Sequence, residues 1–395
     1  MATPDKYNQP EDYLLFIDLL KEELLNDYVR YDDKIYYIYA GVHPEYSILF
    51  RENDSILEQI DEAYLAGKRN IFFECVGEGL LTLVTRKVHD VATIVKEKYP
   101  DVVCVLLTGA SNGEEAYLRL CERFNLTPVL NILSCCYFEL VMKNSWVTNV
   151  FNIDYPIGTR KKIYTCLNRV LRPHRVEFLN RMIAANLIND NCYYSFYDGS
   201  ATNGGLDRLL HIFTQHYPNH VSYIIDNIEF VKTLRLNTDP NRTNPADLRL
   251  EDFNLFLDSY FSVIPETGYY NPATLVYTYE PLEDCAFFSE KTYKSILLKQ
   301  PFILLARKGS LAELRRRGFK TFSPMINETY DTIEDDQLRM DAIVNEVARL
   351  ANQTEDQWEQ WVTKMRDIVE YNFNHLHSQT SYIMDKDLIG RLNII

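Results

Sequence analysis

Residues 288–305, FSEKTYKSILLKQPFILL, decide how this chain is expected to fold. The stretch opens with a short aromatic approach, continues as a helix from Glu290 and passes after Pro301 into the apolar strand FILL. A helix followed at once by a buried strand is the repeating unit of a parallel α/β sheet. Glu290 and Lys291 stand at the start of the helix, where free backbone N–H groups and the helix dipole favour anions. The stretch therefore predicts an α/β fold with a place for an anionic group.

Two interpretations of the Glu290-Lys291 pair stay open on sequence alone. Acid–base pairs are common in the first turn of helices, so a solvated helix start explains the pair without any ligand. Alternatively, Glu290 accepts hydrogen bonds from a sugar hydroxyl while Lys291 neutralises a phosphate oxygen. These are the two needs of a bound nucleotide-sugar.

The composition favours a soluble protein with either one large hydrophobic core or, as we expect, two ordinary ones. The 395 residues are 46% hydrophobic, enough for two ordinary domains. The formal net charge of −15 gives no overall attraction to nucleic acid or to an anionic membrane. Two basic segments, residues 160–181 and 307–320, oppose this total. They indicate either a confined anion site or solvated basic helix faces.

The cysteines and the chain start point to a reducing compartment. The eight cysteines show no C-x-x-C spacing and several lie in apolar runs, so we interpret them as buried thiols. The first residues lack the apolar core of a signal peptide, and no run approaches membrane-spanning length. We expect a cytoplasmic protein with no membrane span.

The first 150 or so residues alternate strand-like and helix-like segments. Strands are expected at residues 34–40, 70–75, 102–108, 128–133 and 147–153, and helices at 11–29, 55–66, 80–98, 114–124 and 137–143. Such alternation predicts an open, doubly wound parallel sheet, whose ligands bind at the loops after the strands. Those loops are residues 41–45, 76–79 and 109–113.

A second alternating set follows a pause near residue 155. Strands are expected at residues 162–167, 192–197, 259–264, 273–279, 302–305 and 319–322, and helices at 175–186 (starting near Pro173), 205–216, from 290, 310–317, 337–350 and 355–373. The prediction is two Rossmann-like α/β domains facing a cleft, at residues 1–155 and 156–350. The tail, 351–395, contributes a helix that packs back on the first domain.

Polar side chains follow three strands of the second domain, and each cluster has a simpler explanation as a cap or a solvated surface. The clusters are Asn168, Arg169 and Arg175; Glu266 and Thr267; and Ser289, Glu290 and Lys291. The arginines suit a diphosphate because a guanidinium makes bidentate contacts. Glu266 suits either a ribose or sugar contact, or the capping of its own turn.

As an ordered set, residues 166–179, 263–267 and 289–305 resemble the donor-binding half of GT-B glycosyltransferases. The likeness is greatest to fucosyltransferase-like and phage- or giant-virus-type members and covers about residues 160–350. It implies that Arg175 and Lys291 contact the donor diphosphate and Glu290 the ribose. One departure is that Leu298-Lys299-Gln300 stands where the fucosyltransferase pattern has Ala-Gly. The resemblance therefore assigns neither the sugar nor the nucleobase of the donor.

The expected activity is transfer of a sugar from a UDP- or GDP-type donor to an acceptor hydroxyl, with no permanently bound cofactor. Nothing in the sequence calls for a metal, because no Asp-x-Asp flanked by apolar residues is present. The expected acceptor is a glycan or a hydroxylated DNA base, and the phage-type resemblance suggests the DNA base. If the protein is viral, its expected location is the cytoplasm of the host cell. The alternative is a non-catalytic nucleotide- or sugar-binding protein on a degenerate scaffold. An epimerase is disfavoured because no G-x-G-x-x-G follows the first strand.

A catalytic base is expected in the first, acceptor-side domain. His43, Glu74 and Glu78 lie at the ends of its strands and can project toward the donor. Each has a simpler interpretation: His43 before Pro44 suits a turn, and Glu74 suits a buried hydrogen-bonded acid.

Overall fold

The computed structural model describes residues 35–40, 48, 51–75, 82–134, 138–139, 154–168, 172–196, 205–216, 218–234, 250–270 and 285–378. The chain divides into two compact units. Unit 1 comprises Met1–Tyr137, Pro272–Phe287 and Thr380–Ile395, and unit 2 comprises Phe138–Asn271 and Phe288–Gln379. The first boundary thus falls before the expected residue 155, and a later segment of the chain returns to unit 1.

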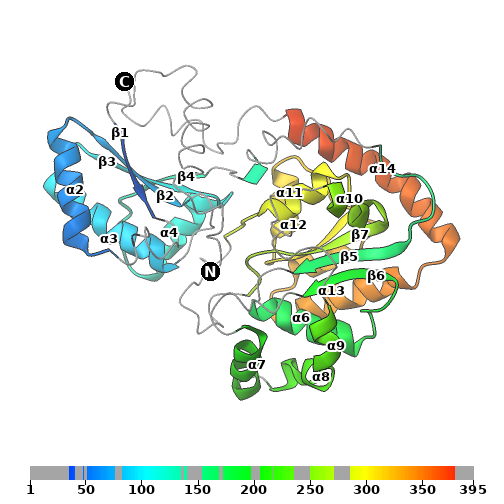
Figure 1. Cartoon of the computed structure of the whole chain (residues 1–395). Coiled ribbons are helices and arrows are strands. Elements are labelled where there is room, and N and C mark those ends of the chain that lie inside the picture. Colours follow the sequence, from blue (N-terminus) through cyan, green and yellow to red (C-terminus); the bar gives the residue numbers. More distant parts are fainter. Residues whose placement is uncertain are drawn as a thin grey trace. The chain divides into compact units, whose positions relative to one another are not determined.

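The described strands of unit 1 form a parallel sheet in sequential order, β1-β2-β3-β4 (Figure 1). The elements are β1 (Ile35–Tyr39), α2 (Asn53–Leu65), β2 (Asn70–Cys75), α3 (Thr82–Lys98), β3 (Val103–Thr108), α4 (Gly113–Arg123) and β4 (Asn131–Ser134). Parallel crossovers are right-handed, so a sheet wound in one direction carries its connecting helices on one face.

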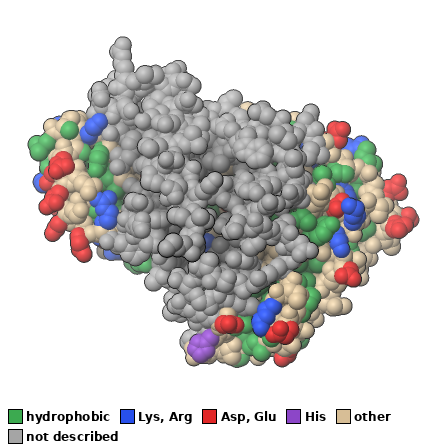
Figure 2. Space-filling model, in the orientation of Figure 1, with side chains coloured by type: hydrophobic (Ala, Val, Ile, Leu, Met, Phe, Trp, Pro, Cys, Tyr) green, Lys and Arg blue, Asp and Glu red, His purple; other side chains and the backbone are tan. Residues whose placement is uncertain are grey.

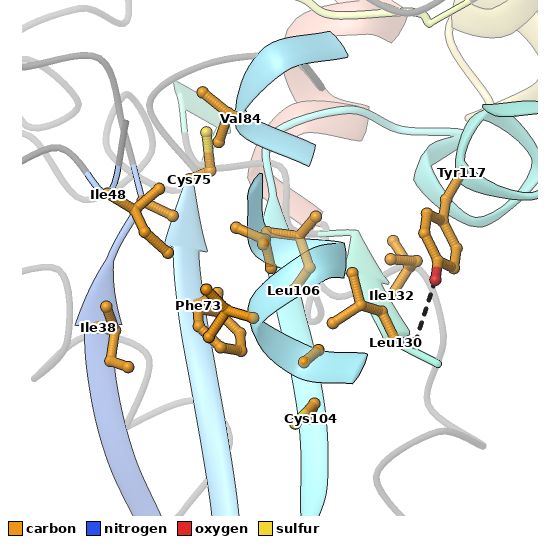
Figure 3. Close-up of a cluster of buried hydrophobic side chains, with 14 of the residues drawn as sticks. Ile38, Ile48, Phe73, Cys75, Val84, Cys104, Leu106, Tyr117, Leu130 and Ile132 are labelled. Carbon is orange, nitrogen blue, oxygen red and sulfur yellow. Dashed lines mark hydrogen bonds between the residues drawn. The ribbon is translucent and has the colours of Figure 1, made fainter. Parts of the chain in front are cut away.

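The core of unit 1 lies between that face and the three helices. Ile38, Phe73, Leu106 and Ile132 are register partners across the four strands, and Figure 3 shows them in one cluster. α3 adds a buried stripe at a spacing of three to four residues, formed by Val84, Val88, Val91 and Val95. Each such side chain contributes about 1.5–3 kcal/mol through burial.

A buried tyrosine joins α3, α4 and the approach to β4. The hydroxyl of Tyr117 accepts the backbone N–H groups of Val129 and Leu130 at 3.0 and 3.2 Å. Figure 3 shows the bond to Leu130. It lies 2.9 Å from Nδ1 of His89. Since the hydroxyl oxygen already accepts two bonds, its proton is directed to Nδ1, which therefore acts as the acceptor. Burial lowers the pKa of His89, which favours this neutral state.

The described strands of unit 1 are added to the sheet in one direction only, whereas a doubly wound sheet, in which the strand order reverses, was expected. The helix expected at 11–29, the strand expected at 147–153 and the loops 41–45 and 76–79 lie outside the described residues.

Unit 2 contains a parallel sheet that is wound in both directions. Its strands are β5 (Lys162–Asn168), β6 (Cys192–Phe196), β7 (Ser259–Pro265) and β8 (Phe302–Leu305), in the order β6-β5-β7-β8. The chain leaves β5 toward β6 on one side, and leaves β7 toward β8 on the other. β5 and β7 are therefore the neighbours at which the winding reverses.

Helices cover both faces of this sheet. They are α6 (Pro173–Ala184), α7 (Gly205–His216), η5 (Pro218–His220), α8 (Ser222–Asp226), α9 (Ile228–Thr233), α10 (Leu250–Leu257), α11 (Glu290–Leu297), α12 (Ser310–Arg316), η7 (Glu328–Thr332), α13 (Asp336–Ala351) and α14 (Glu355–Ser378). Figure 1 shows α6 and α13 on one side of the sheet, and α10, α11 and α14 on the other. The expectation of an α/β fold with parallel sheets is confirmed.

The described tail helix α14 packs within unit 2, where we had expected it on the first domain. Trp358 stacks on Tyr260 of β7 with ring centroids 4.0 Å apart, and Trp361 lies 6.0 Å from Phe261. β7 thus supplies the aromatic surface that the apolar stripe of α14 covers. An apolar stripe does not specify which sheet it covers, and the described helix belongs to unit 2.

The strand expected at residues 319–322 does not form. Instead, the backbone N–H and C=O of Lys320 bond to the side-chain amide of Asn372 on α14, both at 2.8 Å. The side chain thereby takes the place of a neighbouring strand. Among the described helices, none is long and apolar enough to cross a membrane.

Candidate functional site at the carboxyl edge of unit 2

The polar residues singled out in the second domain gather where the winding of the unit 2 sheet reverses. β5 ends at Asn168 and β7 at Pro265, and these two strands are neighbours. In open α/β sheets, ligands bind beyond the carboxyl ends of the strands at such a switch point. The starts of α6 and α11 lie at the same edge because each helix follows one of these strands.

Glu266 connects the end of β7 to the start of α11. One carboxylate oxygen accepts the backbone N–H of Ser289 at 3.2 Å and the hydroxyl of Thr292 at 2.6 Å. The other accepts the hydroxyl of Ser289 at 2.7 Å and the backbone N–H of Thr267 at 3.1 Å. The residue is fully buried. Of its two expected roles, the contacts therefore favour capping over a sugar contact.

The anion expected at the start of α11 is thus supplied by the chain itself. Ser289 is the N-cap of this helix, and its hydroxyl also accepts the backbone N–H of Lys291. These groups fill the positions that a phosphate would take at this helix end.

Glu290 and Lys291 form a partly buried pair. Lys291 Nζ lies 2.8 Å from Glu290 Oε1 and 3.0 Å from Ser289 Oγ. The side chains of Glu290 and Lys291 are only 10% and 20% exposed, so the solvated first turn is not observed. Burial acts to raise the pKa of Glu290, but the charge and hydrogen bond of Lys291, with the charge of Arg175, outweigh it and lower that pKa.

The first turn of α6 is attached to the end of β7. Arg175 donates to the carbonyls of Pro265 and Glu266 at 2.8 and 3.3 Å, and Nε2 of His174 lies 2.9 Å from the Glu266 carbonyl. Because a carbonyl only accepts, Nε2 of His174 carries its proton. Burial, with the charges of Arg175 and Arg172, holds the pKa of His174 well below its ordinary value. Burial and the charge of Arg172 lower the pKa of Arg175 to about 9.

Arg172 and His174 belong to this edge but were not among the selected residues. Arg172 is the half-buried N-cap of α6, a helix that has no side-chain cap. Its place directly before Pro173, a residue favoured at the first helical position, is the sequence signal that identifies it.

The other selected residues fall in several places. Asn168 is buried, and its amide nitrogen donates to the Ser195 carbonyl at 3.1 Å. Glu74 is buried on β2 of unit 1, in register with Leu107, and its side chain is on the face opposite the cluster of Figure 3. Arg169, His43 and Glu78 lie outside the described residues.

The described basic side chains of residues 160–181 and 307–320 mostly form contacts within unit 2. Described residues of 160–181 bond to carboxylates or backbone carbonyls: Arg160 to Pro156, Leu257 and Ser259, Lys161 to Asp258, Lys162 to Asp190, and Arg181 to Glu177 and Asp341. In 307–320 the partners are Tyr270 for Arg307, Glu334 for Lys308, Glu328 for Arg315, Glu313 for Arg316, Glu139 for Arg317 and the Tyr371 ring for Lys320. Figure 2 shows acidic and basic side chains interspersed over the described surface of one face.

The loop after β3 in unit 1, expected to bind a ligand, holds a segment of the chain instead. The Ser111 N–H donates to the Ala286 carbonyl at 2.9 Å, and the Ala286 N–H donates to Asn112 Oδ1 at 2.9 Å. Ser134 Oγ accepts the N–H of Gly113 at 3.1 Å, at the start of α4. The polar groups of this loop therefore serve the fold of unit 1.

Among the residues that the structure describes, no group of three or more His, Cys, Asp or Glu side chains is placed to hold a metal ion. Comparisons with protein-family models, with curated proteins and with solved structures each found no match. The likeness to GT-B glycosyltransferases therefore rests on the residues quoted for it.

Proposed function

We propose that unit 2 binds a nucleoside-diphosphate sugar at the carboxyl edge between β5 and β7, and that the protein is a glycosyltransferase. One observation carries the proposal. The three segments that the resemblance assigns to the donor, around residues 168–175, 266–267 and 289–292, meet at the switch point of one doubly wound sheet. Strand order and sequence motif are independent indications of the same edge.

The charges at this edge suit the departure of a nucleoside diphosphate. In the proposed reaction the acceptor hydroxyl oxygen bonds to the anomeric carbon of the sugar, and the bond from that carbon to the diphosphate oxygen breaks. Negative charge grows on the leaving diphosphate, and fixed cations such as Lys291, with the uncapped start of α6, stabilise it. The hydroxyl proton passes to a base, for which Glu74, His43 and Glu78 remain the candidates.

Several finer points are part of this proposal. They are a donor of UDP or GDP type, a glycan or hydroxylated DNA base as acceptor, a reaction without metal, two domains that close on a cleft, and a cytoplasmic location. Arg175 donates to two backbone carbonyls of the fold, so Lys291 is the better supported of the two expected diphosphate contacts.

Thermal unfolding with UDP-, GDP-, ADP- and CMP-linked sugars and the free diphosphates tests donor binding. A ligand that binds only the folded protein stabilises it by about 2.7 kcal/mol at a hundred times its dissociation constant. We expect one nucleotide to raise the melting temperature of the wild type, and Lys291→Ala to reduce that rise. Lys161→Ala is the matched control, because it removes the same charge from a surface pair at the amino edge of the same sheet.

Turnover separates the enzyme from the binding protein. The active donor should release its nucleoside diphosphate when an acceptor hydroxyl is supplied. Binding without transfer or donor hydrolysis would favour the alternative, a non-catalytic nucleotide- or sugar-binding protein. If no nucleotide changes the melting temperature, the glycosyltransferase proposal fails.

A further inference from the structure

We propose that Arg172 is the arginine that holds the phosphate groups of the ligand, and that Arg175, which the resemblance selects, is a positioning residue. This inference rests on the function proposed for the same edge of unit 2. It makes the uncapped start of α6 the main place of the phosphates, in addition to the Lys291 contact proposed above.

The side chain of Arg175 already bonds to groups of the protein itself. Its guanidinium donates to two backbone carbonyls at the end of β7, and the residue is only 2% exposed. Turning it toward a ligand would take its donor from the Pro265 carbonyl and leave only His174 on the Glu266 carbonyl, and buried polar groups without partners are costly. Its contacts therefore hold the first turn of α6 against β7.

Arg172 has no such occupation. Its backbone carbonyl accepts the N–H groups of Arg175 and Val176 at the start of α6. Within the described part of the chain its side chain makes no hydrogen bond or ion pair, and its Nε atom is buried without a hydrogen-bond partner. The other described cations of residues 160–181 all have carboxylate or carbonyl partners. A phosphate would satisfy Arg172 through the bidentate contacts that a guanidinium makes well.

The charge balance of the edge also calls for an anion. His174, neutral in the fold, experiences the positive charges of Arg172, Arg175 and Lys291. Two carboxylates face these three cations, which leaves one positive charge in excess among the described groups. Glu266 has both oxygens engaged with α11 and its own turn, and Glu290 is paired with Lys291. Arg175 interacts electrostatically with Glu266 and Glu290 and donates to two carbonyls, which leaves Arg172, among the described groups of this edge, as the cation whose side chain has neither kind of partner.

Two further features of this edge suit a ligand. α6 has twelve residues and no side-chain cap at its start, whereas α11 is capped by Ser289. Asn168, four residues before Arg172, is 3% exposed and its Oδ1 has no hydrogen-bond partner among the described residues. A carbonyl-type oxygen of this kind is an acceptor for a ligand hydroxyl.

Calorimetric titration of the full chain with UDP, GDP, the parent nucleosides and pyrophosphate tests the inference. We expect Arg172→Ala to weaken nucleoside diphosphate binding about 10- to 100-fold, the scale of a hydrogen bond to a charged group. Nucleoside binding and the melting temperature should be unchanged, because no described protein group bonds to the Arg172 side chain and the alanine variant keeps its backbone carbonyl. Arg172→Lys should lose less of the affinity for the nucleoside diphosphate, since lysine keeps the positive charge but cannot make the bidentate contacts of a guanidinium.

Arg175→Ala and Lys161→Ala serve as comparisons. Arg175→Ala should lower the melting temperature and weaken nucleoside and nucleotide binding alike, which is the signature of a positioning role. Lys161→Ala should change neither measurement.

The possible failures are distinguishable. If the wild type binds a nucleoside diphosphate and Arg172→Ala binds it equally well, this inference is wrong while the proposed function stands. If no nucleotide binds but pyrophosphate binds through Arg172, the phosphate site is supported and the proposed function fails. Absence of binding to any phosphate compound removes both, and an unfolded Arg172→Ala chain would show a structural role and overturn the inference.

Discussion

Replacing Glu266 by alanine should destabilise unit 2 strongly and loosen the start of α11. The carboxylate accepts four hydrogen bonds, from two backbone N–H groups and from the hydroxyls of Ser289 and Thr292. All four donors would lose their acceptor, and the connection between β7 and α11 would be lost with them.

The size of the effect follows from these contacts. Hydrogen bonds to a charged group contribute about 1.5–3 kcal/mol each, so four of them set a ceiling of about 6–12 kcal/mol. The change also removes the cost of burying a charge, and water can reach some of the freed donors. Breaking a buried charged interaction from one side typically costs about 3–5 kcal/mol, which is the expected loss for Glu266→Ala. Glu266→Gln keeps one acceptor oxygen and should lose about 1–3 kcal/mol.

Urea unfolding followed by tryptophan fluorescence measures this loss in the correct unit, because all three tryptophans belong to unit 2. Glu334→Ala is the matched control: this carboxylate is 77% exposed in a surface pair with Lys308, and its loss should change the unfolding free energy by about 0.5 kcal/mol or less. A loss below about 1 kcal/mol in Glu266→Ala would refute the reasoning, because the buried donors would then have other acceptors.

Three further predictions concern the two cores. Gly113→Ala should lower the free energy of unfolding by about 1–3 kcal/mol through overpacking, since the added Cβ would lie 2.7 Å from Thr108 Cγ2. Thermal unfolding measures this loss. Trp361→Ala should cost about 3–5 kcal/mol in the urea titration, because the side chain is fully buried in unit 2. Unit 1 should lose stability as the pH falls below about 6.5, because burial lowers the pKa of His89 and the unfolded chain therefore takes up the proton first. Far-UV circular dichroism in urea at pH 7.5 and 5.5 tests this, and His89→Gln should show a smaller pH dependence.

The strands of both units could be predicted well because local composition determines them. Residues 70–75 and 302–305 were expected as strands and form β2 and β8 with those bounds. Short runs of β-branched, aromatic and aliphatic residues between polar turns specify a buried strand before any tertiary contact is known. Residues 319–322 have the same appearance, but a side chain of α14 bonds to their backbone. Only the tertiary structure distinguishes the two cases.

The candidate site could be located from the sequence, but the roles of its residues could not. A strand end followed by a helix start places Glu266, Ser289 and Arg175 at one edge, and the structure brings them together. Which polar group faces its neighbours and which remains available depends on side-chain direction and burial. Arg172 and Arg175 are three residues apart in one basic segment, yet only Arg175 bonds to the carbonyls at the end of β7.

The division of the chain has a consequence for its synthesis on the ribosome. Unit 1 includes Pro272–Phe287, which the chain supplies only after most of unit 2. In this segment Cys285 belongs to the core of unit 1, and Ala286 bonds to Ser111 and Asn112 of the β3–α4 loop. While β5, β6 and β7 are being synthesised, β1–β4 still lack that segment, although domains usually fold in order from the N-terminus. A nascent chain arrested before residue 285 would therefore expose polar groups of Ser111 and Asn112 that the finished protein covers. For the same reason, a fragment that ends at Tyr137 lacks part of unit 1.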